Sequence, residues 1–234
     1  MVYVLLMMGG SGVRLGANIP KQFIEVEGTP IFSYIVQSLE KMDEIDGIVI
    51  VVHKDWIEFV NNWRNASATL KKVAHIVPGG DTRSESVLNG LYALSGTANN
   101  DDIVLIHDST HPYVDEDGTR AVIEGVKKYG GATLASFPYD TCYQMNENRV
   151  LTGVIPRTKL AIGASPEAFR FGQILSIYSN ASREELNTMT SAGAIALAHN
   201  IDMVVVPANL LNLKITYQED IELFEKLAHG YFFD

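Results

Sequence analysis

The sequence of 234 residues contains a single cysteine and has more acidic than basic residues. One cysteine, Cys142, excludes an internal disulfide and a cysteine-based metal cage, and we interpret it as a half-buried strand residue rather than a nucleophile. With 18 basic against 28 acidic residues, the net charge of −10 argues against a nucleic-acid-binding surface, because a phosphate backbone requires a basic face. The few cations therefore indicate where a small polyanionic ligand binds.

Long apolar runs and linkers are also lacking. The longest apolar runs, such as residues 2–8, are far too short to cross a bilayer, and no charged segment precedes them. We therefore expect no membrane association, no signal peptide and a cytoplasmic protein. No repeat, low-complexity tract or linker divides the chain, which predicts a single domain over residues 1–234.

Short β-branched apolar runs alternate with segments of helical periodicity. This alternation predicts an α/β fold with a mostly parallel, doubly wound (Rossmann-like) sheet and helices on both faces. The last two helices are expected to begin at capping pairs, Ser182 with Glu185 and Thr216 with Glu219. The predicted strands are residues 2–8, 47–53, 73–77, 103–107, 132–137 and 203–206, and the predicted helices are residues 30–41, 84–94, 115–129, 166–178, 182–199 and 216–228.

Residues 141–155 break this alternation. Strand-like residues flank Asn146, Glu147 and Asn148 without a helical stripe, which predicts a protruding β-hairpin arm within residues 138–156. A projecting hairpin cannot bury both of its faces alone. We therefore favour a homodimer contact through the arm over a hairpin that packs against its own domain.

A glycine-rich turn directly after the first apolar run is the strongest functional signal. Gly9, Gly10 and Gly12 allow several backbone N–H groups to point at a phosphate. Arg14 and Lys21 add positive charge within the same stretch. The turn therefore predicts a site for a nucleoside triphosphate.

A nicotinamide dinucleotide is the competing ligand for this turn. The spacing G-x-G-x-x-x-G is a variant of the dinucleotide-binding pattern. The acidic ribose-binding residue that should follow about 20 residues later is lacking, and a Pro-Lys-Gln segment interrupts the expected helix. An NAD(P)-dependent oxidoreductase is therefore the weaker alternative.

Two further turns follow predicted strands. Residues 79–87 form a second glycine-rich strand-to-helix turn, in which Arg83, Ser84 and Ser86 lie near a helix N-terminus that can hold an anion or a base edge. Asp108 directly follows the strand at residues 103–107, where a carboxylate can hold Mg²⁺. A hydrolase triad of His107, Asp108 and Ser109 is disfavoured, because neighbouring strand residues point to opposite faces and there is no G-x-S-x-G elbow.

Lys214 stands within a short apolar segment, residues 212–216, that reads as a strand before the last helix. Burying an unpaired ammonium is costly, so this interpretation requires an anionic partner for Lys214. A carboxylate or a bound phosphate would supply it.

In order and spacing, these motifs resemble the cytidylyltransferase family that includes the 2-C-methyl-D-erythritol 4-phosphate and ribitol-5-phosphate enzymes. The resemblance covers nearly the whole chain and is carried by GGSGVRLG with PKQF, GGDTRSESVLNGL, HDSTHP, Arg157 and LNLKIT. It implies a reaction of CTP with a polyol phosphate, aided by Mg²⁺, that releases pyrophosphate and leaves a CDP-polyol. The acceptor phosphate would attack the α-phosphorus in line, with positioning and electrostatics providing most of the rate.

The resemblance also implies roles for individual residues. The catalytic cations would be Arg14, Lys21 and Lys214, and Asp108 would hold the metal. The nucleotide would contact Gly9, Gly10, Gly12, Gly80, Asp81 and Ser86. The acceptor would contact Thr141, Arg157, Thr188 and the position of His111, and Arg157 would reach a neighbouring subunit through the arm.

Departures from the family pattern lie on the acceptor side. His111 stands where the family usually has arginine, Met189 and Thr190 replace acidic residues, and residues 164–167 read ASPE instead of QTPQ. A different acceptor explains this distribution, and Ser109 favours the ribitol type slightly. A nucleotide-binding homologue with little catalysis is the remaining alternative.

Overall fold

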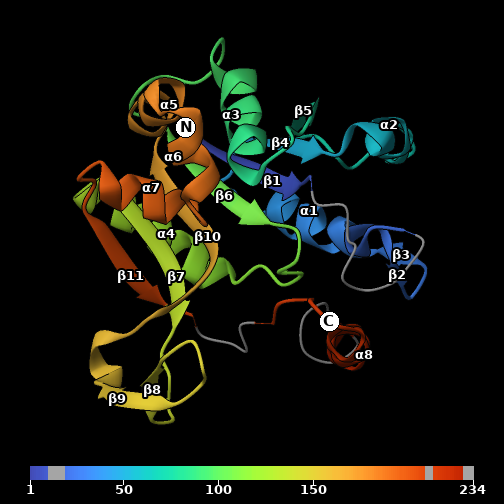
Figure 1. The fold of residues 1–234 in the computed structure, drawn as a ribbon. Helices are drawn as coiled ribbons and strands as arrows, with labels where there is room; N and C mark the ends of the chain where they lie inside the picture. Colours follow the sequence, from blue (N-terminus) through green and yellow to red (C-terminus); the bar gives the residue numbers. More distant parts are fainter. Residues whose placement is uncertain (10–18, 209–212, 229–234) are drawn as a thin grey trace.

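The computed structural model describes residues 1–9, 19–208 and 213–228. Seven strands form the central sheet in the order β11-β7-β10-β6-β1-β4-β5 (Figure 1), and neighbours are parallel except where β10 runs antiparallel to β6 and β7. The predicted mostly parallel, doubly wound α/β sheet is thereby confirmed. The strands of this sheet are β1 (Val2–Met8), β4 (Gly47–Val52), β5 (Val73–Pro78), β6 (Ile103–Asp108), β7 (Gly131–Ser136), β10 (Ile162–Arg170) and β11 (Met203–Pro207), and β2 (Glu25–Val26) pairs separately with β3 (Thr29–Pro30).

Helices cover both faces of the sheet because both faces carry apolar side chains. Successive residues of a strand point to opposite faces, so each strand contributes to both. In β1, Val4, Leu6 and Met8 pack on the face covered by α1, α2 and α4, and the intervening residues pack on the face of α3, α5, α6 and α7. No helix of the described chain is long and apolar enough to cross a membrane. The helices are α1 (Ile31–Lys41), α2 (Ile57–Asn65), α3 (Arg83–Leu94), α4 (Glu116–Tyr129), α5 (Phe171–Asn180), α6 (Arg183–Thr188), α7 (Ala192–Ala198) and α8 (Gln218–Leu227).

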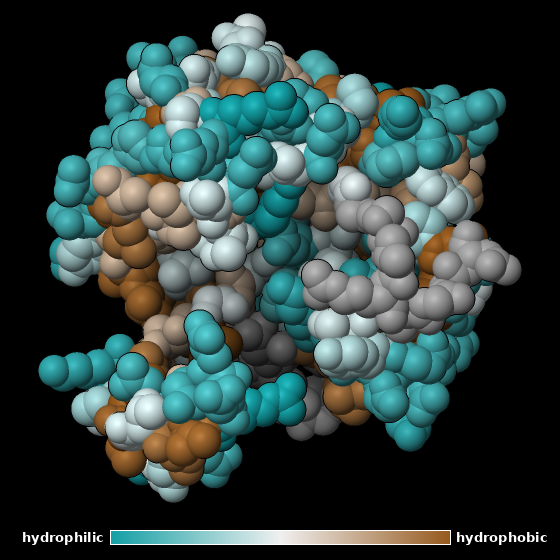
Figure 2. All heavy atoms as spheres, in the orientation of Figure 1, coloured by the Kyte–Doolittle hydropathy of each residue, from teal (hydrophilic) through white to brown (hydrophobic). Residues whose placement is uncertain are grey.

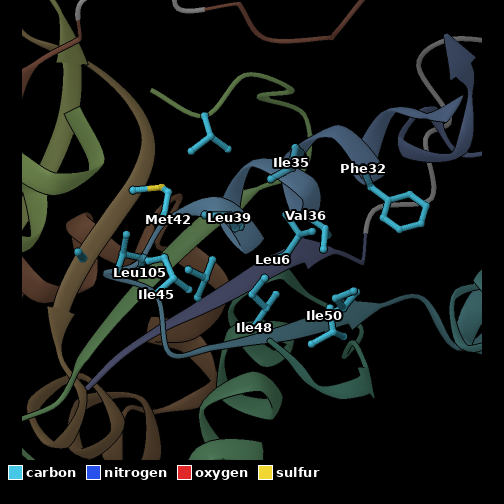
Figure 3. Close-up of a cluster of buried hydrophobic side chains, with 14 of the residues drawn as sticks. Leu6, Phe32, Ile35, Val36, Leu39, Met42, Ile45, Ile48, Ile50 and Leu105 are labelled. Carbon is cyan, nitrogen blue, oxygen red and sulfur yellow. The ribbon is translucent and has the colours of Figure 1, made fainter. Parts of the chain in front are cut away.

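The core between α1 and the sheet shows why this helix forms. Its apolar residues recur at helical spacing, so that Val36 and Leu39 face Leu6 of β1 and Ile48 of β4 (Figure 3). All four side chains are at most 2% exposed. This packing fixes β1, whose last residue immediately precedes the first glycine turn.

The C-terminal helix α8 packs on residues near the start of α1 in a separate apolar cluster. Ile215 and Phe224 pack there with Ile31, and the rings of Phe224 and Tyr34 meet edge to face at 5.6 Å. The carboxylate of Asp220 accepts the backbone N–H groups of Thr216 and Tyr217, so the helix begins one residue later than the expected pair of Thr216 with Glu219 implies.

The predicted helix over residues 166–178 is wrong in its first part. Residues up to Arg170 belong to β10, and α5 begins at Phe171. Ala168 and Phe169 are fully buried between β6 and β7, where the sheet supplies their backbone partners. Because a strand buried on both faces has no alternating pattern, its apolar residues merged with the helical stripe that follows.

Two other helical segments also differ from the expectation. The segment at residues 182–199 forms two helices, α6 and α7, rather than one. Ser182 caps α6 as predicted by accepting the N–H of Glu185, but the Glu185 carboxylate contacts His199 at 2.7 Å instead of closing the capping box. Helix α2 was not predicted, and its single buried residue, Val60, explains the weak signal.

The predicted hairpin is confirmed as β8 (Cys142–Met145) and β9 (Leu151–Ile155), which project from the sheet (Figure 1). Tyr143 lies opposite Val154 and Met145 lies opposite Leu151. Each of these four side chains is more than half exposed, and Figure 2 shows hydrophobic side chains gathered on the arm. The arm therefore presents an apolar surface that its own domain leaves uncovered.

Candidate active site

The functional motifs meet at one edge of the sheet because they follow the carboxyl ends of parallel strands. Gly9 follows β1, Gly79 and Gly80 follow β5, and Asp108 ends β6. The first and second glycine turns touch: a Cβ on Gly9 would lie 3.1 Å from Ser86 Oγ, and one on Gly79 would lie 2.9 Å from it and 3.5 Å from Gly9 Cα. Glycine at both positions permits this close approach. Gly10, Gly12 and Arg14 lie outside the described residues.

The second turn is held by hydrogen bonds at the start of α3. Thr82 Oγ1 accepts the N–H of Glu85 at 3.1 Å, and Glu85 Oε2 accepts the N–H groups of Asp81 and Thr82 at 2.8 and 3.2 Å. Ser86 Oγ donates to the Thr82 carbonyl and accepts the N–H of Gly80. Ser86 therefore shapes this turn from a buried position, while the Asp81 side chain is exposed. The nucleotide contacts of Gly80, Asp81 and Ser86 stay predictions.

Lys21 is anchored on both sides of its short 3₁₀ turn, Lys21–Phe23. Gln22 Nε2 donates to the carbonyl of Met8 at 3.0 Å, which ties the turn to the end of β1. Phe23 is buried and stacks on Trp56 with ring centroids 4.3 Å apart. Lys21 Nζ donates to the carbonyl of Ile215 at 2.6 Å. Lys21, which was predicted from the first glycine-rich motif, thus contacts the segment that carries Lys214.

The segment that carries Lys214 is not a strand in its described part, residues 213–216, so that prediction is wrong. Leu213 and Ile215 are buried and Lys214 between them is exposed, which removes the need to pair a buried ammonium. The N–H of Ile215 donates to the carbonyl of Thr110 at 2.8 Å. This bond brings the Lys214 ammonium close enough to Asp108 to lower the pKa of that carboxyl.

Asp108 pairs with Arg83 from the start of α3. Arg83 Nη2 and Nε both donate to Asp108 Oδ1, at 3.0 and 3.3 Å. Burial alone would raise the pKa of the Asp108 carboxyl, but the positive charges of Arg83 and Lys214 outweigh it and hold the pKa below its usual value. Asp108 is therefore an anion at neutral pH.

The surroundings of Asp108 fit a magnesium ion that is held mainly by its substrate. Among the described residues, both bonds from Arg83 go to Oδ1 and no hydrogen bond reaches Oδ2. That part of the chain also contains no group of three or more His, Cys, Asp or Glu side chains that would enclose a metal. Mg²⁺ is commonly bound by one or two carboxylates together with phosphate oxygens. One carboxylate oxygen at this edge suits such a site.

His107 and His111 are buried beneath the same turn. His107 Nε2 hydrogen-bonds to the carbonyl of His111 at 2.9 Å, so this nitrogen does not activate the neighbouring hydroxyl of Ser109. Burial, together with the nearby His107 and Lys214, lowers the pKa of His111 to about 4. At neutral pH, His111 is therefore a neutral hydrogen-bonding group without the charge of an arginine.

This low pKa predicts a loss of stability in mild acid. The unfolded chain takes up a proton at His111 near its ordinary pKa of about 6.5, and the folded chain does so only near 4. The stabilisation is therefore complete above about pH 6.5 and is lost as the pH falls toward 4. In a His111→Asn variant, we expect the free energy of unfolding to decrease between pH 7 and pH 5 by about 2 kcal/mol less than in the wild type. Denaturant unfolding at both pH values measures this, and equal decreases would refute it.

The predicted acceptor residues lie on the arm and on α6. Arg157 follows β9 and donates to the carbonyl of Tyr139, and Thr141 at the base of the hairpin is exposed. Thr188 ends α6, where its hydroxyl donates to the carbonyl of Glu185 at 3.0 Å. Among the described residues no hydrogen bond or ion pair joins these three to Asp108. The face between the arm and the body of the molecule is hollowed (Figure 2). Their acceptor roles stay predictions.

Glu167 is the charged residue near the site that sequence reasoning missed. It lies on β10, beside β6, and is 14% exposed. Burial raises the pKa of its carboxyl because the Arg83 charge and two backbone N–H groups offset burial only in part. Glu167 stands where the QTPQ motif has its last glutamine, and this difference was the available signal. The helix wrongly predicted over residues 166–178 hid the position of Glu167 in the sheet.

The similarity to known proteins extends over nearly the whole chain. A family model described as "IspD: 2-C-methyl-D-erythritol 4-phosphate cytidylyltransferase" matches residues 2–229. The ribitol-5-phosphate cytidylyltransferase of Streptococcus agalactiae serotype Ia is 31% identical, over 95% of this chain and 93% of the relative. The 2-C-methyl-D-erythritol 4-phosphate cytidylyltransferase of Geobacter metallireducens is 34% identical, over 96% of both chains.

A solved structure shares the fold. The crystal structure of 4-diphosphocytidyl-2C-methyl-D-erythritol synthase from Anaerococcus prevotii superposes with a TM-score of 0.82 and covers 97% of this chain and 96% of its own. The identity is 22%, so this likeness concerns the arrangement of the sheet and helices.

Proposed function

Because this chain belongs to the family of 2-C-methyl-D-erythritol 4-phosphate cytidylyltransferases, and is thereby a nucleotidyltransferase, we propose that it transfers CMP from CTP to a polyol phosphate and releases pyrophosphate. The acceptor is of the 2-C-methyl-D-erythritol 4-phosphate or ribitol 5-phosphate type. The observation that carries the proposal is the meeting of two glycine turns, Asp108, Lys21 and Lys214 at one sheet edge. Family membership leaves the nicotinamide alternative without support.

The residues act by position and charge, and none needs to form a covalent bond. The glycine turns approach the triphosphate with their backbone, and Lys21 and Lys214 supply positive charge where negative charge develops at the α-phosphorus. Asp108 holds Mg²⁺, which when bound offsets the charge of phosphate oxygens. Arg14 is proposed to assist Lys21, as the resemblance implies.

Arg157, Thr141 and Thr188 are proposed to bind the acceptor, with His111 as a neutral neighbour. Arg157 lies on the rim of the arm, where a guanidinium can hold the acceptor phosphate by two parallel hydrogen bonds. The loss of positive charge at His111 supports an acceptor whose phosphate is held elsewhere in the site. These acceptor assignments are independent of the nucleotide assignments, so an experiment that disproves them leaves the nucleotide assignments standing.

A pyrophosphate-release assay tests the proposal. The purified protein is given Mg²⁺, each of the four nucleoside triphosphates in turn, and a panel of acceptors that includes both named polyol phosphates, glycerol 3-phosphate and a pentose phosphate. We expect release with CTP and one polyol phosphate only. If CTP raises the melting temperature but no acceptor yields pyrophosphate, the protein is a binding homologue instead.

We further propose that the arm joins two copies of the chain. Its two apolar cross-strand pairs, Tyr143 with Val154 and Met145 with Leu151, are exposed on a two-stranded ribbon that has no sheet behind it. A second copy of the same arm supplies a matching apolar surface.

Adding charge to this surface is expected to separate the copies. A Val154→Glu variant buries a carboxylate in the proposed interface, so we expect light scattering to give the mass of one chain, against two for the wild type. The control is Asn148→Glu, which adds the same charge at the hairpin turn and is expected to stay dimeric. A wild type that has the mass of one chain contradicts the proposal.

A further inference from the structure

The Arg83 guanidinium lies between two carboxylates from different strands. Its Nη2 is 3.0 Å from Asp108 Oδ1 on β6 and 3.7 Å from Glu167 Oε2 on β10. The side chains of Arg83, Asp108 and Glu167 are 33, 26 and 14% exposed, so Glu167 is the most enclosed of the three. One cation is thus shared by the proposed metal carboxylate and by a deeper carboxylate that the proposed mechanism does not use.

Glu167 is itself held in place by the backbone of α7. Its Oε2 accepts the N–H of Ala192 at 3.1 Å and its Oε1 accepts the N–H of Gly193 at 2.9 Å. A Cβ on Gly193 would lie 2.7 Å from Oε1, so the helix approaches as closely as glycine allows. Both carboxylate oxygens are therefore fixed, and the position of the negative charge beside Arg83 is fixed with them.

The geometry of Arg83 is unusual for an arginine beside a carboxylate. A guanidinium commonly takes both oxygens of a carboxylate in a two-bond fork. Here Nε and Nη2 both bond to Oδ1 of Asp108, and Nη2 is turned toward Glu167 as well. Among the described residues, Arg83 therefore makes no hydrogen bond to Asp108 Oδ2.

We propose that Glu167 is a positioning residue, which holds Arg83 away from Asp108 Oδ2 and so keeps that oxygen available to the magnesium-bound triphosphate. The inference rests on the proposed function. It predicts that a neutral side chain of the same shape at residue 167 lets Arg83 compete with the metal for Asp108, although neither the nucleotide turns nor Asp108 is altered.

Calorimetric titration of CTP with Mg²⁺, without acceptor, tests this inference apart from activity. We expect Glu167→Gln to weaken binding about tenfold relative to the wild type. The control is Ser191→Ala, which removes the cap that accepts the N–H of Ala194 and weakens the same helix without touching Arg83. It is expected to change binding less than twofold. Equal losses in the two variants mean that Glu167 only supports α7, and overturn the inference.

A second pair of variants tests whether Glu167 acts through Arg83. In an Arg83→Lys background the charge remains but the fork is gone, so adding Glu167→Gln should weaken binding less than twofold further. A full tenfold further loss overturns the inference. If Glu167→Gln does not fold, Glu167→Asp, which draws the charge back by one methylene group, takes its place in both titrations. A wild type that fails to bind CTP with Mg²⁺ refutes the proposed function itself, whereas equal binding by wild type and Glu167→Gln refutes the positioning role alone.

Discussion

A Lys21→Ala variant is expected to lose at least about 10²–10³-fold in turnover at saturating CTP and acceptor, while it keeps its fold. The lost ammonium would act on charge that develops at phosphorus, and such a contribution appears in the rate rather than in substrate binding. The hydrogen bond from Lys21 to Ile215 is lost as well, which costs on the order of 1 kcal/mol of stability. Pyrophosphate release and thermal unfolding measure the two effects separately.

Lys41→Ala is the matched control for this variant. Lys41 is exposed at the end of α1, so its removal changes the net charge equally at a position away from the sheet edge. We expect its turnover to equal that of the wild type. Normal turnover in Lys21→Ala contradicts the assigned role, and so does a loss of activity that matches the fraction of unfolded protein.

An Asp108→Asn variant is expected to lose about 10³-fold in turnover and to require far more Mg²⁺. The substitution keeps the shape of the side chain but removes the charge that would hold the metal against the triphosphate. It also weakens the bonds from Arg83, which costs on the order of 2 kcal/mol of stability. The measurement is turnover as a function of Mg²⁺ concentration.

Asp102→Asn separates these two effects. Asp102 immediately precedes β6, at the end of the strand opposite to Asp108, and its carboxylate binds the N-terminal ammonium at 2.6 Å. Its neutralisation removes a comparable ion pair but leaves the carboxyl edge of the sheet intact, so the Mg²⁺ requirement should be unchanged. If the two variants respond alike to Mg²⁺, Asp108 does not hold the metal.

The positions of the turns proposed to bind the nucleotide could be predicted because their signals are local. Gly9, Gly80 and Asp108 each follow a short apolar strand, and parallel strands bring their carboxyl ends together whatever their order in the sheet. The structure confirms the meeting of these turns at one edge. The hairpin could also be predicted from the sequence, because its turn residues and strand-like flanks lie within 15 consecutive positions.

Most of what escaped prediction depends on residues that are distant in sequence. Glu167 lies beside Arg83 only because β10 enters the sheet between β6 and β7, and a strand buried on both faces resembles a helix in its composition. The pKa of His111 is lowered by enclosure among residues near 107 and 214. Lys214 was misplaced for a local reason, because the alternation of buried Leu213, exposed Lys214 and buried Ile215 resembles a strand although residues 213–216 join no sheet.

The bond from Lys21 to the carbonyl of Ile215 spans 194 positions of the chain. During synthesis on the ribosome, the proposed reaction centre therefore stays incomplete until residue 215, shortly before α8, has emerged. A nascent chain halted earlier has its sheet and its glycine turns but not the carbonyl that receives the lysine. Activity should thus arise in one step once residue 215 has emerged, instead of growing with the length of the polypeptide.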